Sequence, residues 1–269
     1  MAQAADAFIL TALTDDPALA EACDLAGVDR VGIDIERLGK RERQGHVADA
    51  RISDHRIDDL RRIVPRLARA VPFIRVNALH DGSRGEIDAA VGAGARAIML
   101  PYFRSAEAPR RFVDLVAGRA APLLLIETAA AAADVAAIVA VPGIVEVMVG
   151  LNDLHRDLGL PNHFAVLGLP LIERVAAAVR DAGLIFGFGG VAHPGDASLP
   201  VAPDLVYAEY ARLGARSAWL SRAFFRHPGA TGDLGRATEA LRARLAFWRA
   251  ASPADLARQH AALVEAAAR

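Results

Sequence analysis

Short apolar runs alternate with longer amphipathic segments along most of the chain. Most of these runs end in Gly, Pro, Asp or Asn, as the strands of α/β proteins do. The predicted strands are Phe8–Leu13, Val31–Ile35, Phe73–Asn77, Ala97–Leu100, Leu123–Ile126, Val145–Val149, Leu184–Gly187 and Ser217–Leu220. Eight such strands, each followed by a helix, close into a TIM (β/α)8 barrel, whereas five or six form an open doubly wound sheet. The number of runs favours the barrel.

The segments between the runs carry the signals of helices. Pro17 is typical of a first helical position, and Ser105 is expected to be an N-cap. The predicted helices are Pro17–Ala26, Ile57–Ala70, Ser105–Ala117, Ala129–Val141, Phe164–Ala182 and Val201–Leu213. A glycine-rich turn is expected after the seventh strand, at Gly187–Gly190, and it leads to His193. No G-x-G-x-x-G follows the first strand, which weakens the case for a dinucleotide-binding sheet.

The C-terminal part of the chain predicts extra helices beyond the barrel. We expect residues 1–230 to form the barrel and residues 231–269 to form two helices, broken near Ser252 and Pro253. The last helix, Asp255–Ala268, is rich in alanine and has few large apolar residues. It would make a weak core element alone, so we expect it to pack on a neighbouring subunit or to be exchanged with one.

Composition excludes several classes of protein. The 269 residues include 31 basic and 32 acidic side chains, so no charge excess points to nucleic acid or to an anionic membrane. The most apolar stretch, Ala120–Val149, contains charged residues and a proline, which argues against a membrane span. One cysteine, Cys23, allows no disulfide within the chain. The N-terminus lacks a basic signal region, and we expect a cytoplasmic protein.

Lysine is almost absent. The 31 basic residues comprise thirty arginines and a single lysine, Lys40, a bias that a GC-rich genome would explain. Any reaction through a Schiff base must therefore use Lys40 or not occur.

Two carboxylates follow neighbouring predicted strands. Glu127 ends the fifth strand and Asp153 follows the sixth, and adjacent strands lie about 4.8 Å apart. Two such carboxylates repel each other unless a positive group lies between them, and an all-oxygen set suits Mg²⁺ or Mn²⁺. The structural alternative is that Glu127 pairs with an arginine and that Asp153 caps the next turn.

Other polar residues lie at the same predicted face. Arg75 interrupts an apolar strand, and its permanent charge needs an acceptor. That acceptor could be Asp34 or Glu36 at the end of the second strand, or it could be a substrate carboxylate or enolate oxygen. His46 lies in the long polar connection after this strand, where a solvated histidine is the simpler interpretation.

Several motifs together resemble the HpcH/HpaI aldolase and citrate lyase β-subunit family. They are Arg75-Val76-Asn77-Ala78-Leu79, Gly85-Glu86-Ile87-Asp88, Ala97-Ile98-Met99-Leu100-Pro101, Leu125-Ile126-Glu127-Thr128, Val149-Gly150-Leu151-Asn152-Asp153-Leu154 and Asp157-Leu158-Gly159. The acidic motif Asp34-Ile35-Glu36 lies where that family carries one. Each piece alone is weak, but the combination is specific.

The resemblance implies a TIM barrel enzyme that makes or cleaves a carbon–carbon bond. It implies a class II aldolase, which works through a metal-bound enolate of pyruvate or a related 2-keto acid. Glu127 and Asp153 would bind the divalent ion (Mg²⁺ or Mn²⁺, with Co²⁺ as a further candidate), and Arg75 would stabilise the enolate. The backbone of Gly150, Leu151 and Asn152 would hold the keto-acid carboxylate. The implied assembly is a homotrimer or homohexamer.

One departure from the family pattern affects the expected chemistry. The pyruvate aldolases carry a histidine directly after the acidic motif, where this chain has Arg37. The general base is therefore open among a metal-bound hydroxide, His46, Asp34 and Glu36, and Arg37 is expected to bind substrate. The expected substrates are a 2-keto acid and an aldehyde. A coenzyme A thioester lyase of the malyl- or citramalyl-CoA type and a non-catalytic ligand-binding barrel are the alternatives.

Overall fold

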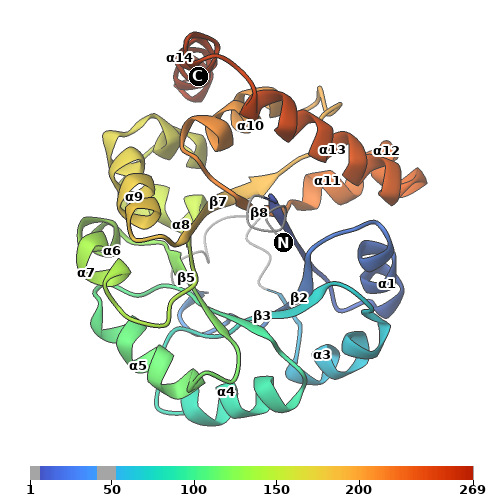
Figure 1. The fold of residues 1–269 in the computed structure, drawn as a ribbon, viewed down its shortest axis with the longest axis vertical. Coiled ribbons are helices and arrows are strands. Elements are labelled where there is room, and N and C mark those ends of the chain that lie inside the picture. The colour runs from blue at the N-terminus through green and yellow to red at the C-terminus, as the bar shows by residue number, and fades with distance from the viewer. Residues whose placement is uncertain (1–6, 41–52, 269) are drawn as a thin grey trace.

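The predicted strands form one closed barrel around which the helices are arranged (Figure 1). The structure is a computed structural model, and it describes residues 7–40 and 53–268. All eight strands are parallel, and each pairs with the next in sequence until β8 closes on β1. The strands are β1 (Ile9–Leu13), β2 (Arg30–Asp34), β3 (Val71–Arg75), β4 (Ala97–Leu100), β5 (Ala121–Ile126), β6 (Glu146–Val149), β7 (Ile185–Val191) and β8 (Ser217–Leu220). The TIM barrel prediction is confirmed.

The helices surround the barrel on its outer side (Figure 1). They are α1 (Pro17–Leu25), α3 (Ile57–Ile63), η2 (Val64–Arg66), α4 (Ser83–Gly92), α5 (Glu107–Val116), α6 (Ala129–Ala133), α7 (Val135–Val139), α8 (Leu151–Asp157), η3 (His163–Gly168), α9 (Pro170–Asp181), α10 (Pro203–Arg212), α11 (Arg222–Arg226), α12 (Pro228–Gly232), α13 (Leu234–Arg249) and α14 (Pro253–Ala267). Their inner faces and the outer faces of the strands form the main apolar core.

Two local predictions were wrong. The glycine-rich segment after the seventh predicted strand is not a turn, because β7 continues to Val191 with an irregular register between Gly187 and Gly190. Only glycine fits at position 187, because a Cβ on Gly187 would lie 2.5 Å from the Ser217 carbonyl oxygen. Ser105 is not the N-cap of α5, which begins at Glu107 after Ala106.

Prolines divide two of the predicted helices. α3 ends at Ile63, and Pro65 lies in the short 3-10 turn that follows. The predicted helix from Phe164 becomes η3 and α9, with Pro170 as the first residue of α9. Proline cannot donate the backbone hydrogen bond of a helix interior but fits a first turn. The periodicity alone did not locate these breaks.

Side chains inside the barrel form layers. An apolar layer occupies the middle, formed by Phe73, Ala97, Met99, Leu123, Leu125 and Met148. At the amino-terminal ends of the strands, Arg30 forms an ion pair with Glu146 at 2.6 Å, and the Ser217 hydroxyl donates to Glu146 at 2.7 Å. A second group of charged side chains lies at the carboxyl-terminal ends. The barrel is therefore a packed core with charged groups at both ends.

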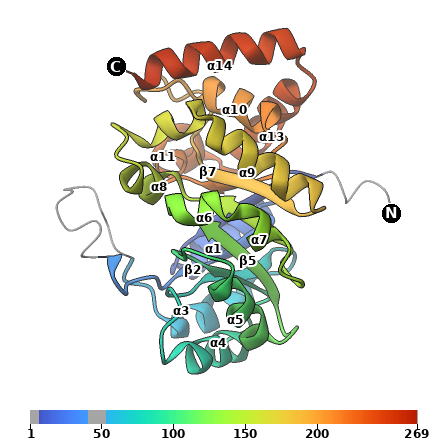
Figure 2. The ribbon, with the colours of Figure 1, turned by 90° about the vertical axis from the view of Figure 1, so that its left-hand side faces the viewer.

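The last helix lies outside the ring, against the outer side of α10 (Figures 1 and 2). Asn162 donates a hydrogen bond to the carbonyl of Ala267, and the His260 ring lies 2.9 Å from a carboxylate oxygen of the buried Glu209. Only Leu263 and Ala267 of α14 are buried. Exchange of this helix between subunits stays a prediction. No helix in the described part of the chain is long and apolar enough to cross a membrane.

Candidate active site

The charged group at the carboxyl ends of the strands comes from four segments of the barrel. Asp34 and Arg75 are the last residues of β2 and β3, and Glu36 lies just beyond β2. Glu127 follows β5, and Asp153 lies in the first turn of α8, directly after β6. Parallel strands in a barrel end at one face, which is where TIM barrel enzymes carry their active sites. The topology therefore gathers residues that are far apart in the sequence.

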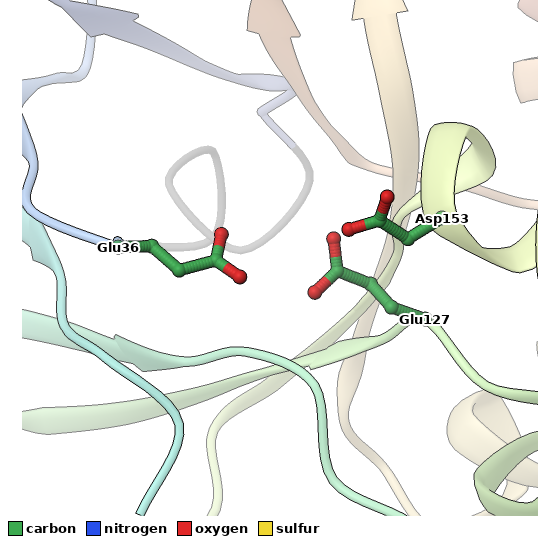
Figure 3. A group of neighbouring side chains, drawn as sticks. All are labelled: Glu36, Glu127 and Asp153. Carbon is green, nitrogen blue, oxygen red and sulfur yellow. The ribbon is translucent and has the colours of Figure 1, made fainter. Parts of the chain in front are cut away.

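Three carboxylates converge at this face. One oxygen each of Glu36, Glu127 and Asp153 lies within 4.8 Å of the others. In Figure 3 the carboxylates of Glu127 and Asp153 face that of Glu36 across a small gap. All three are buried, with 0%, 4% and 5% of their surface exposed. Burial of carboxylates this close to one another is unfavourable without compensating positive charge.

Arg75 supplies part of that compensation. Its Nε and Nη2 donate to the two oxygens of Asp34, at 2.9 and 2.6 Å. Its Nη1 lies 3.1 Å from Glu36 Oε2 and 3.7 Å from Glu127 Oε1. Burial alone would raise the pKa of Asp34, but Arg75 and then Lys40 more than offset this and hold the pKa well below its usual range. Asp34 is therefore a fixed anionic partner of Arg75.

Lys40 is the second cation of the site. Its ammonium lies 3.0 Å from Glu36 Oε2 and 3.5 Å from Asp34 Oδ2, and the side chain is buried. Asp34 and Glu36 are thus each held between Arg75 and Lys40 in a closed ring of ion pairs. The sequence showed that Lys40 is chemically unique but gave no sign that it lies in the site.

Carboxylates outnumber the cations among the described residues of this group. Residues 7–40 and 53–268 place four buried carboxylates (Asp34, Glu36, Glu127 and Asp153) around two buried cations, and the partly exposed Arg156 lies 3.4 Å from Asp153. Burial, together with the charges of Glu36 and Asp153, raises the pKa of Glu127 well above its usual range, against the opposing effect of Arg75. A divalent cation would relieve this repulsion. The all-oxygen donor set fits a hard cation such as Mg²⁺.

Two backbone features hold Glu127 in place. A Cβ on Gly150 would lie 2.5 Å from Glu127 Cγ, so only glycine allows the end of β6 to pass this close. Gly150 therefore adjoins the carboxylate cluster, and Leu151 and Asn152 lie between it and Asp153 in the chain. On the other side, the Tyr102 N–H donates to Glu127 Oε2 at 3.1 Å. Tyr102 has a positive φ of 45°, a strained conformation that recurs at functional sites.

The segment after β2 is fixed by Asn77 and His55. The Asn77 side-chain oxygen accepts the N–H groups of Arg37 and Leu38, at 2.8 and 3.0 Å. The Asp34 N–H donates to His55 Nδ1 at 3.1 Å. His55 is thus a scaffold residue.

The described side-chain contacts of Arg37 and His193 are with residues outside the carboxylate cluster. The Arg37 guanidinium donates to the carbonyls of Ser53 and His55, and its role in substrate binding stays a prediction. His46 lies outside the described residues. His193 stacks on His227, with ring centroids 3.8 Å apart, in the loops after β7 and β8.

Trp219 was missed by the sequence analysis. It lies on β8, and its ring centroid is 4.8 Å from Arg75 Cζ. Within the short apolar run Ser217–Leu220 it gave no signal beyond that of a strand residue.

Fold and site together define the protein as a (β/α)8 barrel with an acidic, arginine-containing centre at the carboxyl ends of its strands. The family model for HpcH/HpaI aldolase/citrate lyase matches residues 8–194. The chain belongs to this family of aldolases and lyases.

Solved structures agree on the fold. The HpcH/HpaI aldolase from Desulfitobacterium hafniense DCB-2 is 21% identical with a TM-score of 0.62, over 86% of this chain and 93% of that one. The citrate lyase β subunit of M. tuberculosis, described in complex with oxaloacetate and magnesium, is 21% identical with a TM-score of 0.57, over 87% and 98%. At these identities the likeness concerns the fold alone.

One curated relative is more similar over a short stretch. A 4-hydroxy-4-methyl-2-oxoglutarate aldolase of Chaetomium globosum is 34% identical over 70 residues. The match spans about a quarter of each protein, 26% in both cases.

Proposed function

We propose that this protein is a divalent-metal-dependent aldolase or lyase that makes or cleaves a carbon–carbon bond through the enolate of pyruvate or a related 2-keto acid. The observation that carries the proposal is the convergence of three buried carboxylates, Glu36, Glu127 and Asp153, beside Arg75. Membership of an aldolase and lyase family supports it. Fold alone would not, since TIM barrels serve many reactions.

Glu127 and Asp153 would hold the ion, with Glu36 close enough to contribute an oxygen or to bind one of the ion's waters. An ion bound here supplies Lewis-acid stabilisation of the charge that develops on the keto oxygen, typically several kcal/mol of barrier lowering. Mg²⁺ and Mn²⁺ suit these ligands, and Co²⁺ is a further candidate. The residues themselves bind, orient and exchange a proton with the substrate.

Arg75 would stabilise the enolate oxygen. Its guanidinium is buried and fixed by Asp34 on one edge, so it is already oriented before charge develops, which is the condition for effective transition-state stabilisation. The backbone of Gly150, Leu151 and Asn152, which begins beside Glu127, would hold the keto-acid carboxylate.

The proton of the substrate methyl group needs a base. Asp34 is poorly suited, because Arg75 engages both of its oxygens and its pKa is lowered. Within the described residues this leaves Glu36, whose carboxylate would accept the C3 proton. The C–H electron pair then forms the C=C bond of the enolate while the C=O π pair moves to the keto oxygen beside Arg75. C3 of the enolate attacks the aldehyde carbonyl, the new alkoxide takes the proton from Glu36, and cleavage is the reverse.

Exchange of the pyruvate methyl protons in D₂O tests the proposal directly. We expect Mg²⁺-dependent loss of the methyl NMR signal with the wild-type protein, and no loss after chelation or with Glu127→Gln. If the Mg²⁺-loaded protein leaves pyruvate unchanged, the pyruvate form of the proposal is wrong. Exchange on a coenzyme A thioester under the same conditions would then favour the thioester lyase.

A Schiff base is the competing chemistry, since the one lysine lies in the site. Borohydride reduces an imine to a stable amine. If pyruvate forms a Schiff base with Lys40, treatment with pyruvate and borohydride would therefore increase the mass of that residue alone. We expect no adduct, because the ammonium is engaged by two carboxylates. An adduct at Lys40 that forms at the rate of turnover would overturn the metal-enolate proposal.

A further inference from the structure

Trp219 and Trp248, the two tryptophans of the chain, have different surroundings. Trp248, on α13, donates its indole N–H to Asp204 at 3.2 Å. Trp219 packs against the apolar layer inside the barrel, and its ring meets Phe73 edge-to-face with centroids 6.2 Å apart. The Trp219 N–H is buried and has no hydrogen-bond partner within the part of the chain that the structure describes. Packing contacts of the ring therefore position Trp219 among the described residues, without a hydrogen bond from its N–H.

One of those faces contacts the active site. Arg75 Cζ lies 4.8 Å from the centroid of the Trp219 ring. The two residues come from β8 and β3, which are separated by β1 and β2 in the barrel, so the contact crosses the interior. The N–H groups of Arg75 thus contact the carboxylates, while its Cζ lies over the indole ring of Trp219.

This contact limits where the guanidinium can go. Arg75 Nη1 lies 3.1 Å from Glu36 and 3.7 Å from Glu127, so it already pairs with both, and a small rotation would bring it closer to Glu127. A tighter pair would neutralise a carboxylate that the proposed ion needs. A cation–π contact is stronger when it is shielded from water, and here it opposes that rotation.

We infer that Trp219 is a positioning residue, which holds Arg75 closer to Asp34 and Glu36 than to Glu127. The effect of this positioning on catalysis rests on the proposed function, but the contact between Trp219 and Arg75 does not. The alternative is that Trp219 merely fills the barrel, in which case any side chain of similar shape would serve equally well.

Fluorinated tryptophan separates these two roles, because fluorine weakens the attraction of the ring for a cation and changes its shape little. In a Trp248→Phe background, Trp219 is the single site of incorporation. We expect kcat for proton exchange to fall stepwise with the number of fluorines, to about a tenth, while KM for pyruvate stays within about twofold and the melting temperature is unchanged. A kcat that does not respond to fluorination would overturn the inference.

Ordinary variants give a second comparison. Trp219→Phe keeps an aromatic face and should retain most of the activity, whereas Trp219→Leu should lose about tenfold or more in kcat and bind Mg²⁺ more weakly. Equal kcat and Mg²⁺ affinity in the two variants would contradict a role through the ring face.

A measurement without turnover keeps the inference independent of the proposed function. The Nε–H signal of Arg75, assigned through Arg75→Lys, should be shifted upfield by the ring current of Trp219. It should move to an ordinary position in Trp219→Leu. An unshifted signal in the wild-type protein would overturn the inference even if the enzyme is active. A shifted signal in an inactive protein would leave the contact intact and remove only the proposed reaction.

Discussion

The barrel buries charged side chains at both ends, and within the described residues the two ends differ in how these side chains are grouped. At the amino-terminal end, Glu146 is matched by Arg30 at 2.6 Å and by the Ser217 hydroxyl. At the carboxyl-terminal end, the described residues place four buried carboxylates around Arg75 and Lys40, and burial with neighbouring negative charge raises the pKa of Glu127. Burial is similar in the two regions. The convergence of carboxylates distinguishes the candidate active site from the ion pair at the other end.

This difference has a physical cause. A buried pair of one anion and one cation requires no further charge, although it contributes little net stability beyond specifying the arrangement. Several carboxylates buried close together repel one another, and a bound cation relieves that repulsion. Changes that act on one region and leave the other intact test this difference.

Removing a carboxylate from the active-site region should have the largest effect. Glu127→Gln or Asp153→Asn should abolish Mg²⁺ binding and lower kcat at least about a thousandfold, or about 4 kcal/mol of barrier. Calorimetric Mg²⁺ titration and methyl-proton exchange measure the two losses. Either variant working at the wild-type rate in the presence of a chelator would show that these residues do not hold the ion.

Breaking the amino-terminal pair should affect stability and leave chemistry alone. Arg30→Met strands the buried Glu146 carboxylate and should lower the free energy of unfolding by about 3 kcal/mol, with unchanged Mg²⁺ affinity. Urea denaturation measures the stability. The double variant Arg30→Met/Glu146→Leu, which removes both charges, should recover most of the loss. A weakened Mg²⁺ affinity in the folded single variant would mean that the two regions are coupled.

Ligands should stabilise the protein through the active-site region alone. Mg²⁺ at a hundred times its dissociation constant should add about 2.7 kcal/mol, or roughly 5–10 °C in melting temperature. Oxalate, which mimics the pyruvate enolate, should add stability only when Mg²⁺ is present. The Arg30→Met/Glu146→Leu variant should respond like the wild type, and Glu127→Gln should not respond. Equal stabilisation of Glu127→Gln would place the ion elsewhere.

The pH should act on the two regions differently. Because the folded pKa of Glu127 is raised, protons and Mg²⁺ compete for it, and the affinity should rise by up to about tenfold per pH unit below that pKa. In the metal-free protein, Glu127 lowers the stability as pH rises from its unfolded pKa of about 4.3 toward the folded value. Asp34 acts in the opposite sense: its lowered pKa stabilises the fold above about pH 4, and this contribution is lost as pH falls. In Glu127→Gln the pH effects that depend on the Glu127 carboxylate should be absent.

The smallest effect is expected at Tyr102. Glycine adopts a positive φ without strain and keeps the N–H that binds Glu127. Tyr102→Gly should therefore change the free energy of unfolding by no more than about 1 kcal/mol and leave Mg²⁺ affinity unchanged. A large loss of Mg²⁺ affinity would instead indicate that the Tyr102 side chain, not its backbone, supports the site.

Much of the architecture could be read from the sequence. The period of apolar runs identified all eight strands, because a barrel strand buried on both faces must be continuously apolar. It failed at Gly187–Gly190, where space inside the barrel made glycines part of β7 and not of a turn. Ser105 failed as a cap because α5 begins two residues later.

By itself, the sequence determined the class of fold, the family, and the polar residues at the strand ends that form the candidate site. These depend on local pattern and motif, which a linear chain displays directly. Only the tertiary structure decided that Lys40 closes a ring of ion pairs with Asp34 and Glu36, and that Trp219 crosses the barrel to lie on Arg75. It also decided that three carboxylates converge at one end of the barrel, whereas Glu146 pairs with Arg30 at the other. Electrostatic balance depends on distance and burial, and barrel closure brings together side chains whose separation along the chain gives no measure of either.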